Sequence, residues 1–306
     1  MAEFETITDG LRFPEGPVVM PDGSVILTEI EQGKITRVKP DGAKETVATT
    51  GGGPNGLALG PDGKLYCCNN GGFEYPETNG YLAPHGIAND YSGGRIERID
   101  IATGQVEILY KSGDHGCVLR GPNDIVFDEH GGFWFTDHGK VDYSKRCHDI
   151  VGIFYAKTDG SHLEEVIFPS NNPNGVGLAP DGSALYAAET YTCRLMKFNI
   201  TAPGKVAPDA GPGGPGIPLY RPAGYKFFDS LAMEAGGNIC VATIGECGIS
   251  VISPEGDLVE FVATDDIFTT NIAFGGDDMM DAYITLSGSG RLVKTRWNRP
   301  GLKLNY

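Results

Sequence analysis

Residues 54–69 read PNGLALGPDGKLYCCN, and this stretch decides the fold. Apolar side chains recur on both sides of the turn PDG, which is the pattern of two β-strands joined by a tight hairpin. The same pattern occurs six times along the chain, beginning at residues 14, 54, 122, 173, 228 and 270. Repetition at intervals of 40 to 68 residues predicts one supersecondary unit used again and again.

Further strand-like runs lie between the copies, such as KITRVKP at 34–40 and RIERIDI at 95–101, and no window predicts a long amphipathic helix. Four short strands per unit, repeated six times, predict an all-β fold, a six-bladed β-propeller. Closing the blades into a ring removes exposed sheet edges. We predict a single domain over 1–306, with the N-terminal strand completing the last blade. Two insertions are predicted to be loops, about 71–94 and 201–218, the first of them either a lid over the channel mouth or a surface loop without such a role.

Composition excludes several classes of protein. The formal net charge of −16 argues against binding to nucleic-acid phosphates. No window approaches 18 continuous apolar residues, so no membrane span is predicted. The N-terminus, MAEFETITDG, has neither the basic region nor the apolar core of a signal peptide. The seven cysteines are odd in number and contain no CxxC pair, which indicates reduced thiols and a cytoplasmic protein. The sequence does not indicate an oligomeric state.

One polar residue occupies the same position in every copy, at the start of its first strand. These six, called here the ring residues, are Glu15, Asn55, Asn123, Asn174, Asp229 and Asn271. The inner strands of a propeller line its central channel, so the six side chains are predicted to form a ring at one mouth. Two carboxylates and several amide oxygens suit a hard divalent cation, Ca²⁺ first, with Zn²⁺, Mn²⁺ and Fe²⁺ open. The alternative is that they are turn residues, bonded to their own backbone.

Four stretches resemble the SMP-30/gluconolactonase family, in the family's order and over nearly the whole chain. They are FPEGPV at 13–18, PNDIVFDEHGGFWFTD at 122–137, NGVGLAPDG at 174–182 and FDSLAM at 228–233. The resemblance implies a six-bladed propeller with one divalent cation in the central channel. It also implies a lactonase, a carboxylic ester hydrolase that opens a sugar aldonolactone, with a small-molecule lactone as its partner.

The resemblance also assigns residues. The implied metal ligands are Glu15, Asn123, Asn174 and Asp229, and Asp229 is also the implied catalytic base. The residues expected at the substrate are Asn55, Asn123, Asn271, Arg120 and His85. Arg120 departs from the family pattern, because it lies three residues before Asn123 where many members place an arginine two before.

Lactone hydrolysis requires a polarised carbonyl, a nucleophilic water and a stabilised oxyanion, and one cation supplies the first and third. Loop histidines are rivals to Asp229 for proton transfer, namely His85, His115, His138 and His148. Aromatic side chains predicted to stack on a cyclic substrate are Phe73, Tyr75, Tyr81 and Tyr143, while Trp134 is predicted to pack between blades.

A second function class stays open from the sequence, a non-catalytic propeller that binds a metal or a small molecule. No GxSxG elbow, Walker loop or HExxH motif offers a different chemistry. The identity of the lactone and of the metal stays open as well.

Overall fold

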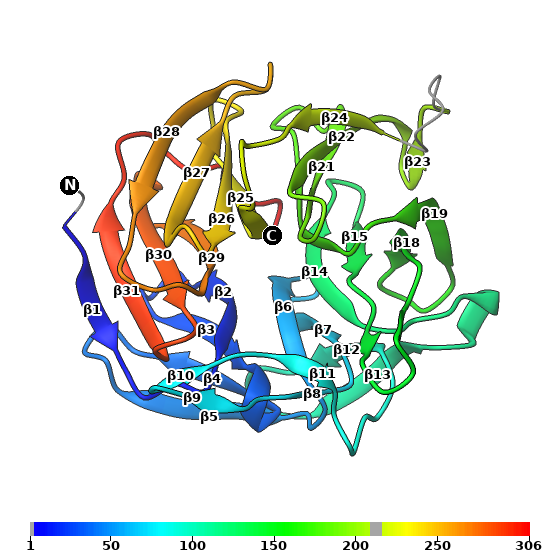
Figure 1. Ribbon diagram of the computed structural model, residues 1–306, viewed down its shortest axis with the longest axis horizontal. Coiled ribbons are helices and arrows are strands. Elements are labelled where there is room, and N and C mark those ends of the chain that lie inside the picture. Colours follow the sequence, from blue (N-terminus) through cyan, green and yellow to red (C-terminus); the bar gives the residue numbers. More distant parts are fainter. Residues whose placement is uncertain (1–2, 209–215) are drawn as a thin grey trace.

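The computed structural model describes residues 3–208 and 216–306, in which six antiparallel blade sheets are arranged in a ring (Figure 1). Residues of the inner strands line a central channel with a volume of about 1300 Å³. The strands of the first three blades are β2 (Pro14–Val19), β3 (Val25–Glu29), β4 (Lys34–Val38) and β5 (Lys44–Thr49); β6 (Pro54–Leu59), β7 (Leu65–Asn69), β12 (Arg95–Ile99) and β13 (Val106–Lys111); and β14 (Pro122–Phe127), β15 (Gly132–Asp137), β18 (Val151–Lys157) and β19 (Leu163–Ser170).

The strands of the last three blades are β20 (Pro173–Leu178), β21 (Ala184–Glu189), β22 (Arg194–Ala202) and β24 (Ile217–Tyr220); β25 (Phe227–Met233), β26 (Ile239–Ile244), β27 (Gly248–Ile252) and β28 (Leu258–Ala263); and β29 (Thr269–Gly275), β30 (Asp281–Leu286), β31 (Arg291–Arg296) and β1 (Glu5–Thr8). The pairing of β1 with β31 closes the ring. The predicted propeller, its six blades and its N-terminal closing strand are therefore confirmed.

Apolar side chains fill the seams between neighbouring blades rather than one central core. In one seam, Tyr66 and Ile96 of the second blade pack with Phe133 and Phe154 of the third. Similar clusters occupy the other five seams. Trp134 packs with residues of β20 and β21 in the next blade, as predicted. Each blade therefore depends on its neighbours for the burial of its faces.

Both predicted insertions carry more structure than simple loops. The first contains β8 (Phe73–Glu74), β9 (Glu77–Thr78), β10 (Tyr81–Leu82) and β11 (His85–Ile87), paired as β8–β11 and β9–β10. In the second, β22 runs on to Ala202 and pairs with β23 (Lys205–Val206), and β24 begins at Ile217. Residues 209–215 lie outside the described part of the chain.

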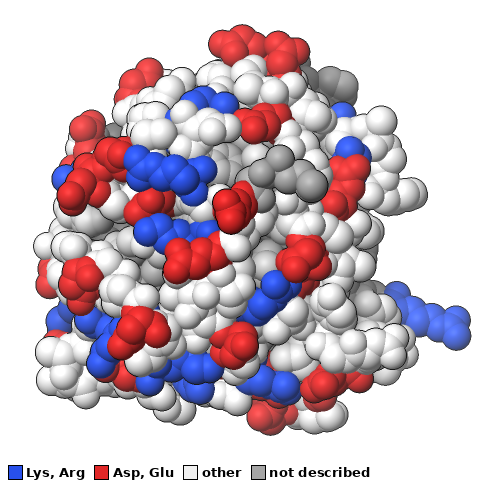
Figure 2. Space-filling model, turned by 90° about the vertical axis from the view of Figure 1, so that its left-hand side faces the viewer, with Lys and Arg blue, Asp and Glu red and all other residues white. Residues whose placement is uncertain are grey.

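The remaining elements are short. A further hairpin, β16 (Val141–Asp142) with β17 (Cys147–His148), lies on the same side of the molecule as the first insertion. The helical segments of the described residues are the 3₁₀ turns η1 (Ile30–Gln32) and η2 (Asp114–Gly116), and no helix among those residues could cross a membrane. Figure 2 shows acidic and basic side chains interspersed over one side of the ring.

Gly16 lies where two inner strands approach each other closely. Its φ is 54°, and a Cβ atom there would lie 2.4 Å from the backbone oxygen of Asn55 in the next blade. Gly63 also has a positive φ, 72°, but a Cβ atom there would meet nothing within 4 Å. We expect Gly63→Ala to lower the free energy of unfolding by about 1 kcal/mol and Gly16→Ala by at least about 3 kcal/mol. Urea denaturation measures both, and equal losses would contradict close packing at the ring.

Candidate functional site

The six ring residues lie at or near the start of the inner strands β2, β6, β14, β20, β25 and β29, and each side chain is at most 8% exposed. In every blade the pairing of the inner strand with the second strand is interrupted at the ring residue or next to it. Such an irregularity releases side chains from strict alternation between the two faces of a sheet. The repeat thus places six polar side chains at one end of the channel.

Hydroxyl groups on the second strands fix the backbone of the ring. The Thr28 hydroxyl donates to the backbone oxygens of Glu15, at 3.0 Å, and of Asn55 in the next blade, at 2.9 Å. Thr136 donates in the same way to Asn174 in the following blade, and Ser287 to Pro14 across the closure of the ring. These hydrogen bonds join neighbouring blades directly at the ring.

A second set of buried polar residues ends the second strands of four blades, and the sequence analysis missed its role. Its members are Glu29, Asn69, Asp137 and Glu189. The Asp137 carboxylate accepts the backbone N–H groups of Arg120 and Gly121, both at 2.7 Å, and so holds the segment that enters β14. Burial raises the pKa of Asp137 to about 6. The sequence contains a signal for this second set, because each of these four repeats ends with a polar residue.

Glu15 and Asp229 are the two carboxylates of the ring. Glu15 Oε2 accepts the Asn271 side-chain amide and the Gly16 backbone N–H, each at 2.8 Å. Burial raises the pKa of Glu15 despite these bonds. Burial, and then the charge of Glu15, raise the pKa of Asp229 well above its usual value. Two like charges thus face each other in a site with little water to screen them.

Several oxygen atoms at the ring have room for a positively charged ligand. Glu15 Oε1 and Asn123 Oδ1 are buried and have no hydrogen-bond partner among residues 3–208 and 216–306. The Asn174 amide nitrogen donates to Thr190 at 3.2 Å, and the Asn174 Oδ1 has only a long contact of 3.5 Å with the Ser230 hydroxyl. Buried acceptors without donors are costly unless a ligand supplies the missing charge.

These oxygen atoms fit a hard divalent cation, although only two of the ring residues are carboxylates. The described residues contain no group of three or more His, Cys, Asp or Glu side chains placed to hold a metal ion. A cation at the ring would therefore depend on amide oxygens beside its two carboxylates. Mixed carboxylate and amide oxygen sets are typical of Ca²⁺ and unsuited to metals that need thiolate or imidazole ligands.

Asp124 is a third buried carboxylate near the ring, and the sequence analysis did not single it out. Its carboxylate accepts the Ile125 backbone N–H at 2.9 Å and the Val176 backbone N–H at 3.3 Å. Burial and the charge of Glu15 raise the pKa of Asp124 to about 7. The sequence held a signal here, because the corresponding residue is glycine in three other copies, at positions 16, 56 and 175.

Asn271 bonds to its own backbone, which is the alternative that the sequence left open for the ring residues. Its side-chain oxygen accepts the Ile272 backbone N–H at 2.8 Å, as a turn residue does, while its amide group holds Glu15. Asn55 is buried at the corresponding place in the second blade. Both are brought to the ring as predicted, and their contact with substrate stays a prediction.

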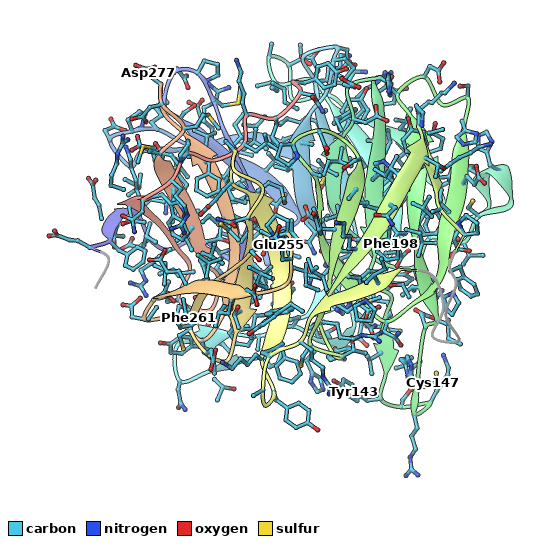
Figure 3. All side chains as sticks on the ribbon, turned by 90° about the horizontal axis from the view of Figure 1, so that it is seen from above. Tyr143, Cys147, Phe198, Glu255, Phe261 and Asp277 are labelled. Carbon is cyan, nitrogen blue, oxygen red and sulfur yellow. The ribbon has the colours of Figure 1, made fainter. Side chains whose placement is uncertain are left out.

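Arg120 and His85 belong to the rim around the mouth. The Arg120 guanidinium pairs with Asp149 at 3.0 Å and lies over the Tyr91 ring. The His85 ring stacks on Tyr143 with the ring centroids 4.6 Å apart. Their predicted roles at the substrate stay predictions. Figure 3 shows Tyr143 and Cys147 at the face of the molecule opposite to Asp277, which lies in the turn after β29.

The histidines predicted as alternatives to Asp229 for proton transfer differ in burial and in their contacts. His115 contacts the backbone oxygen of Gly160 through Nε2 at 3.1 Å. His148 lies in β17 and lines a hollow of about 500 Å³ together with Tyr143 and Tyr191. His138 is partly buried beside Tyr191, and burial, then the charge of Lys140, lower the pKa of His138 to about 4. His138 is therefore neutral near pH 7.

The first insertion extends from the second blade to the sixth, along one side of the mouth (Figure 1). The Leu82 backbone N–H donates to Gly288 in the sixth blade at 3.1 Å. The Tyr75 ring packs against Phe13 with the centroids 5.0 Å apart, and Phe13 directly precedes Pro14 and Glu15. Burial, then the charges of Glu15 and Asp229, raise the pKa of Tyr75, so its phenol keeps its proton. The insertion thus covers part of the mouth.

Comparison with known proteins identifies the family. The family described as SMP-30/Gluconolactonase/LRE-like region matches residues 13–288. The chain therefore belongs to the SMP-30/gluconolactonase/LRE-like family, as the sequence motifs indicated.

Individual relatives agree with this membership. The Lactonase drp35 of Staphylococcus haemolyticus is 29% identical over 266 residues, covering 83% of this chain and 73% of that protein. The match to the Staphylococcus epidermidis drp35 covers 64% of its length, so the chain spans about two thirds to three quarters of these relatives.

Two solved structures share the fold. A gluconolactonase from Xanthomonas campestris superposes with a TM-score of 0.75 at 20% identity, covering 96% of this chain and 89% of that one. A calcium-binding regucalcin from Agrobacterium tumefaciens gives a TM-score of 0.72 at 18% identity, covering 99% and 98%.

The neutral state of His138 predicts a pH dependence of stability. Between about pH 6.5 and pH 4 the unfolded chain binds a proton at this residue that the folded protein does not bind. Acidification from pH 7 to pH 4 therefore costs stability through His138, by about 1–2 kcal/mol after allowance for partial exposure. We expect His138→Asn to remove this contribution, measured by urea denaturation of both proteins at several pH values. His130→Asn, which changes an exposed histidine, is the control, and an unchanged pH slope in His138→Asn would refute the prediction.

Proposed function

We propose that the protein is a metal-dependent lactonase that opens the ring of a sugar aldonolactone. The observation that carries this proposal is a pair of buried oxygens, Glu15 Oε1 and Asn123 Oδ1, that have no hydrogen-bond partner within the described part of the chain and accompany a second buried carboxylate, Asp229. Such a set of buried oxygens at a channel mouth costs free energy unless a bound ligand interacts with it.

Family membership and the relatives support the class of reaction. The drp35 proteins are named lactonases, and one structural neighbour is named a gluconolactonase. Another neighbour is named a calcium-binding protein, which agrees with the oxygen donors of the ring. Ca²⁺ is therefore our first choice of cation.

The proposed ligands of the cation are Glu15, Asn123, Asn174 and Asp229. A bound cation would polarise the lactone carbonyl and offset negative charge that develops on its oxygen. The Asn271 amide and the Gly16 N–H hold one oxygen of Glu15, so its other oxygen stays free toward the ligand.

Asp229 is the proposed base, accepting a proton from the attacking water at its carboxylate. A carboxylate that also binds a cation is a weaker base. Asp124, whose carboxylate accepts only backbone N–H groups among the described residues, offers a second carboxylate near the ring for that proton. Asn55, Asn123 and Asn271 would orient the substrate through their positions at the mouth.

The two like charges predict opposite effects of one substitution on stability. In chelator-treated protein, Asp229→Asn removes repulsion between buried carboxylates, and we expect a higher free energy of unfolding by about 1–3 kcal/mol. With Ca²⁺ at about 100 times its dissociation constant, the unchanged protein gains about 2.7 kcal/mol, and the variant gains far less. Thermal unfolding with and without Ca²⁺ measures both effects. A variant that is less stable in chelator and equally stabilised by Ca²⁺ would exclude Asp229 as a ligand.

Activity is tested by proton release from a panel of γ- and δ-aldonolactones. Chelator-treated protein is assayed alone and with Ca²⁺, Mn²⁺, Fe²⁺ or Zn²⁺. We expect one cation to restore hydrolysis, and Asp229→Asn and Asn174→Ala to lower kcat/KM by at least about 100-fold. Asn199→Ala, which changes an exposed asparagine on β22, is the matched control. Folded protein that binds the cation but hydrolyses no lactone would favour the non-catalytic binding propeller.

A further inference from the structure

Lys140 is a buried amine that the proposed chemistry does not use. It follows β15 and is 2% exposed. Its Nζ donates to Asn70 Oδ1 and to the Gly72 backbone oxygen, both at 3.0 Å, and lies 3.2 Å from the centroid of the Phe73 ring. No carboxylate of the described residues lies within ion-pair distance of it. Burying an amine without an ion pair costs free energy. These contacts therefore indicate that the position of the segment bound by the amine is important.

What Lys140 holds is the beginning of the first insertion. Its three partners lie at the point where the chain leaves β7 and starts across the mouth. The insertion has only strands of two or three residues, so its own ladders give it little rigidity. Two hydrogen bonds and a cation–π contact from the third blade therefore set the path of the chain two residues before Tyr75.

Tyr75 packs in a cluster with Phe13 and with Leu82, another residue of the insertion. Its ring packs on Phe13 at the entry to β2, and Phe13 also contacts Phe268 at the entry to β29. Phe13 adopts a φ of 56°, a left-handed conformation that costs about 1 kcal/mol for a non-glycine residue and must be held by its surroundings. The Tyr75 hydroxyl has no hydrogen-bond partner in the part of the chain that the structure describes.

We propose that Tyr75 determines substrate specificity by donating a hydrogen bond to a hydroxyl substituent beside the lactone carbonyl, and that Lys140 is the positioning residue that holds Tyr75 there. This inference rests on the proposed function and deepens it, because it names the residue that would recognise the hydroxyl group next to the carbonyl of an aldonolactone. A phenol O–H can both donate and accept a hydrogen bond, which suits pairing with a hydroxyl group. Sites built this way discriminate strongly against analogues that lack the group.

The test compares α-hydroxy-γ-butyrolactone with γ-butyrolactone. We expect the unchanged protein to prefer the hydroxylated lactone by at least about 10-fold in kcat/KM. Tyr75→Phe should lose most of this preference, because its kcat/KM should fall at least about 5-fold further for the hydroxylated lactone than for γ-butyrolactone. Lys140→Met should lose the same preference, mainly through KM. In the double variant, Tyr75→Phe should have no further effect, because Lys140 acts through Tyr75.

Lys145→Met is the matched control, since Lys145 is an exposed lysine in the neighbouring hairpin. Hydrogen exchange of residues 71–82 gives a readout independent of activity, and we expect faster exchange in Lys140→Met only. Equal preference in Tyr75→Phe and the unchanged protein would overturn the role of Tyr75. Additive losses in the double variant, or unchanged exchange in Lys140→Met, would overturn the role of Lys140.

Failure of the proposed function would be recognised separately. If the unchanged protein hydrolyses neither lactone, calorimetry with D-gluconate in the presence of Ca²⁺ tests recognition of a hydroxy acid without catalysis. Weaker binding by Tyr75→Phe, with Ca²⁺ binding unchanged, would support the inference even then. Identical gluconate affinity in both proteins, or no binding by either, would overturn it.

Discussion

Closure of the ring is the constraint on which the rest of this structure depends. The ladder between β1 and β31 brings residues 5–8 beside residues 292–294. Only then can β2 lie against β29, and only then does the Asn271 amide reach Glu15, a partner 256 residues away in the sequence. The candidate site therefore does not belong to any one blade, and it exists only when the last blade has met the first. Contacts of such sequence separation are typically the late and slow ones in folding.

The electrostatics of the mouth follow from that closure. Glu15, Asp124 and Asp229 come from three different blades and are all buried. Burial raises the pKa of each, and the charge of Glu15 raises the pKa of Asp124 and of Asp229 further. The seams between blades are apolar and carry the stability, so the ring can hold an unfavourable set of charges. Stability in one part of a fold is commonly what permits a strained or charged site in another.

Sequence pattern predicted the blades, the closing strand and the six ring positions, because alternation and repetition are local properties. It did not predict the irregularities in the inner strands, which depend on how neighbouring blades approach. It did not single out Asp124, although a carboxylate in place of the glycine at positions 16, 56 and 175 changes the chemistry of the ring. The pairing of Lys140 with Asn70 joins residues 70 positions apart and has no trace in either local sequence. Arg120 was assigned from a motif, and its ion pair with Asp149 could not be read from spacing.

The hydroxyl bonds of Thr28, Thr136 and Ser287 have a consequence for how such proteins diversify. Each hydroxyl lies in one repeat and holds the backbone of the next repeat, at a ring residue for Thr28 and Thr136 and at the residue before Glu15 for Ser287. A repeat gained by recombination would bring its own ring side chain. The hydroxyl group that hydrogen-bonds to its backbone, however, would come from the neighbouring repeat. The unit of inheritance at the ring is therefore a pair of adjoining repeats, whereas the rim insertions, which leave from the ends of strands, can be exchanged singly. Lineages of this fold should accordingly change their rims often and their rings in coupled steps.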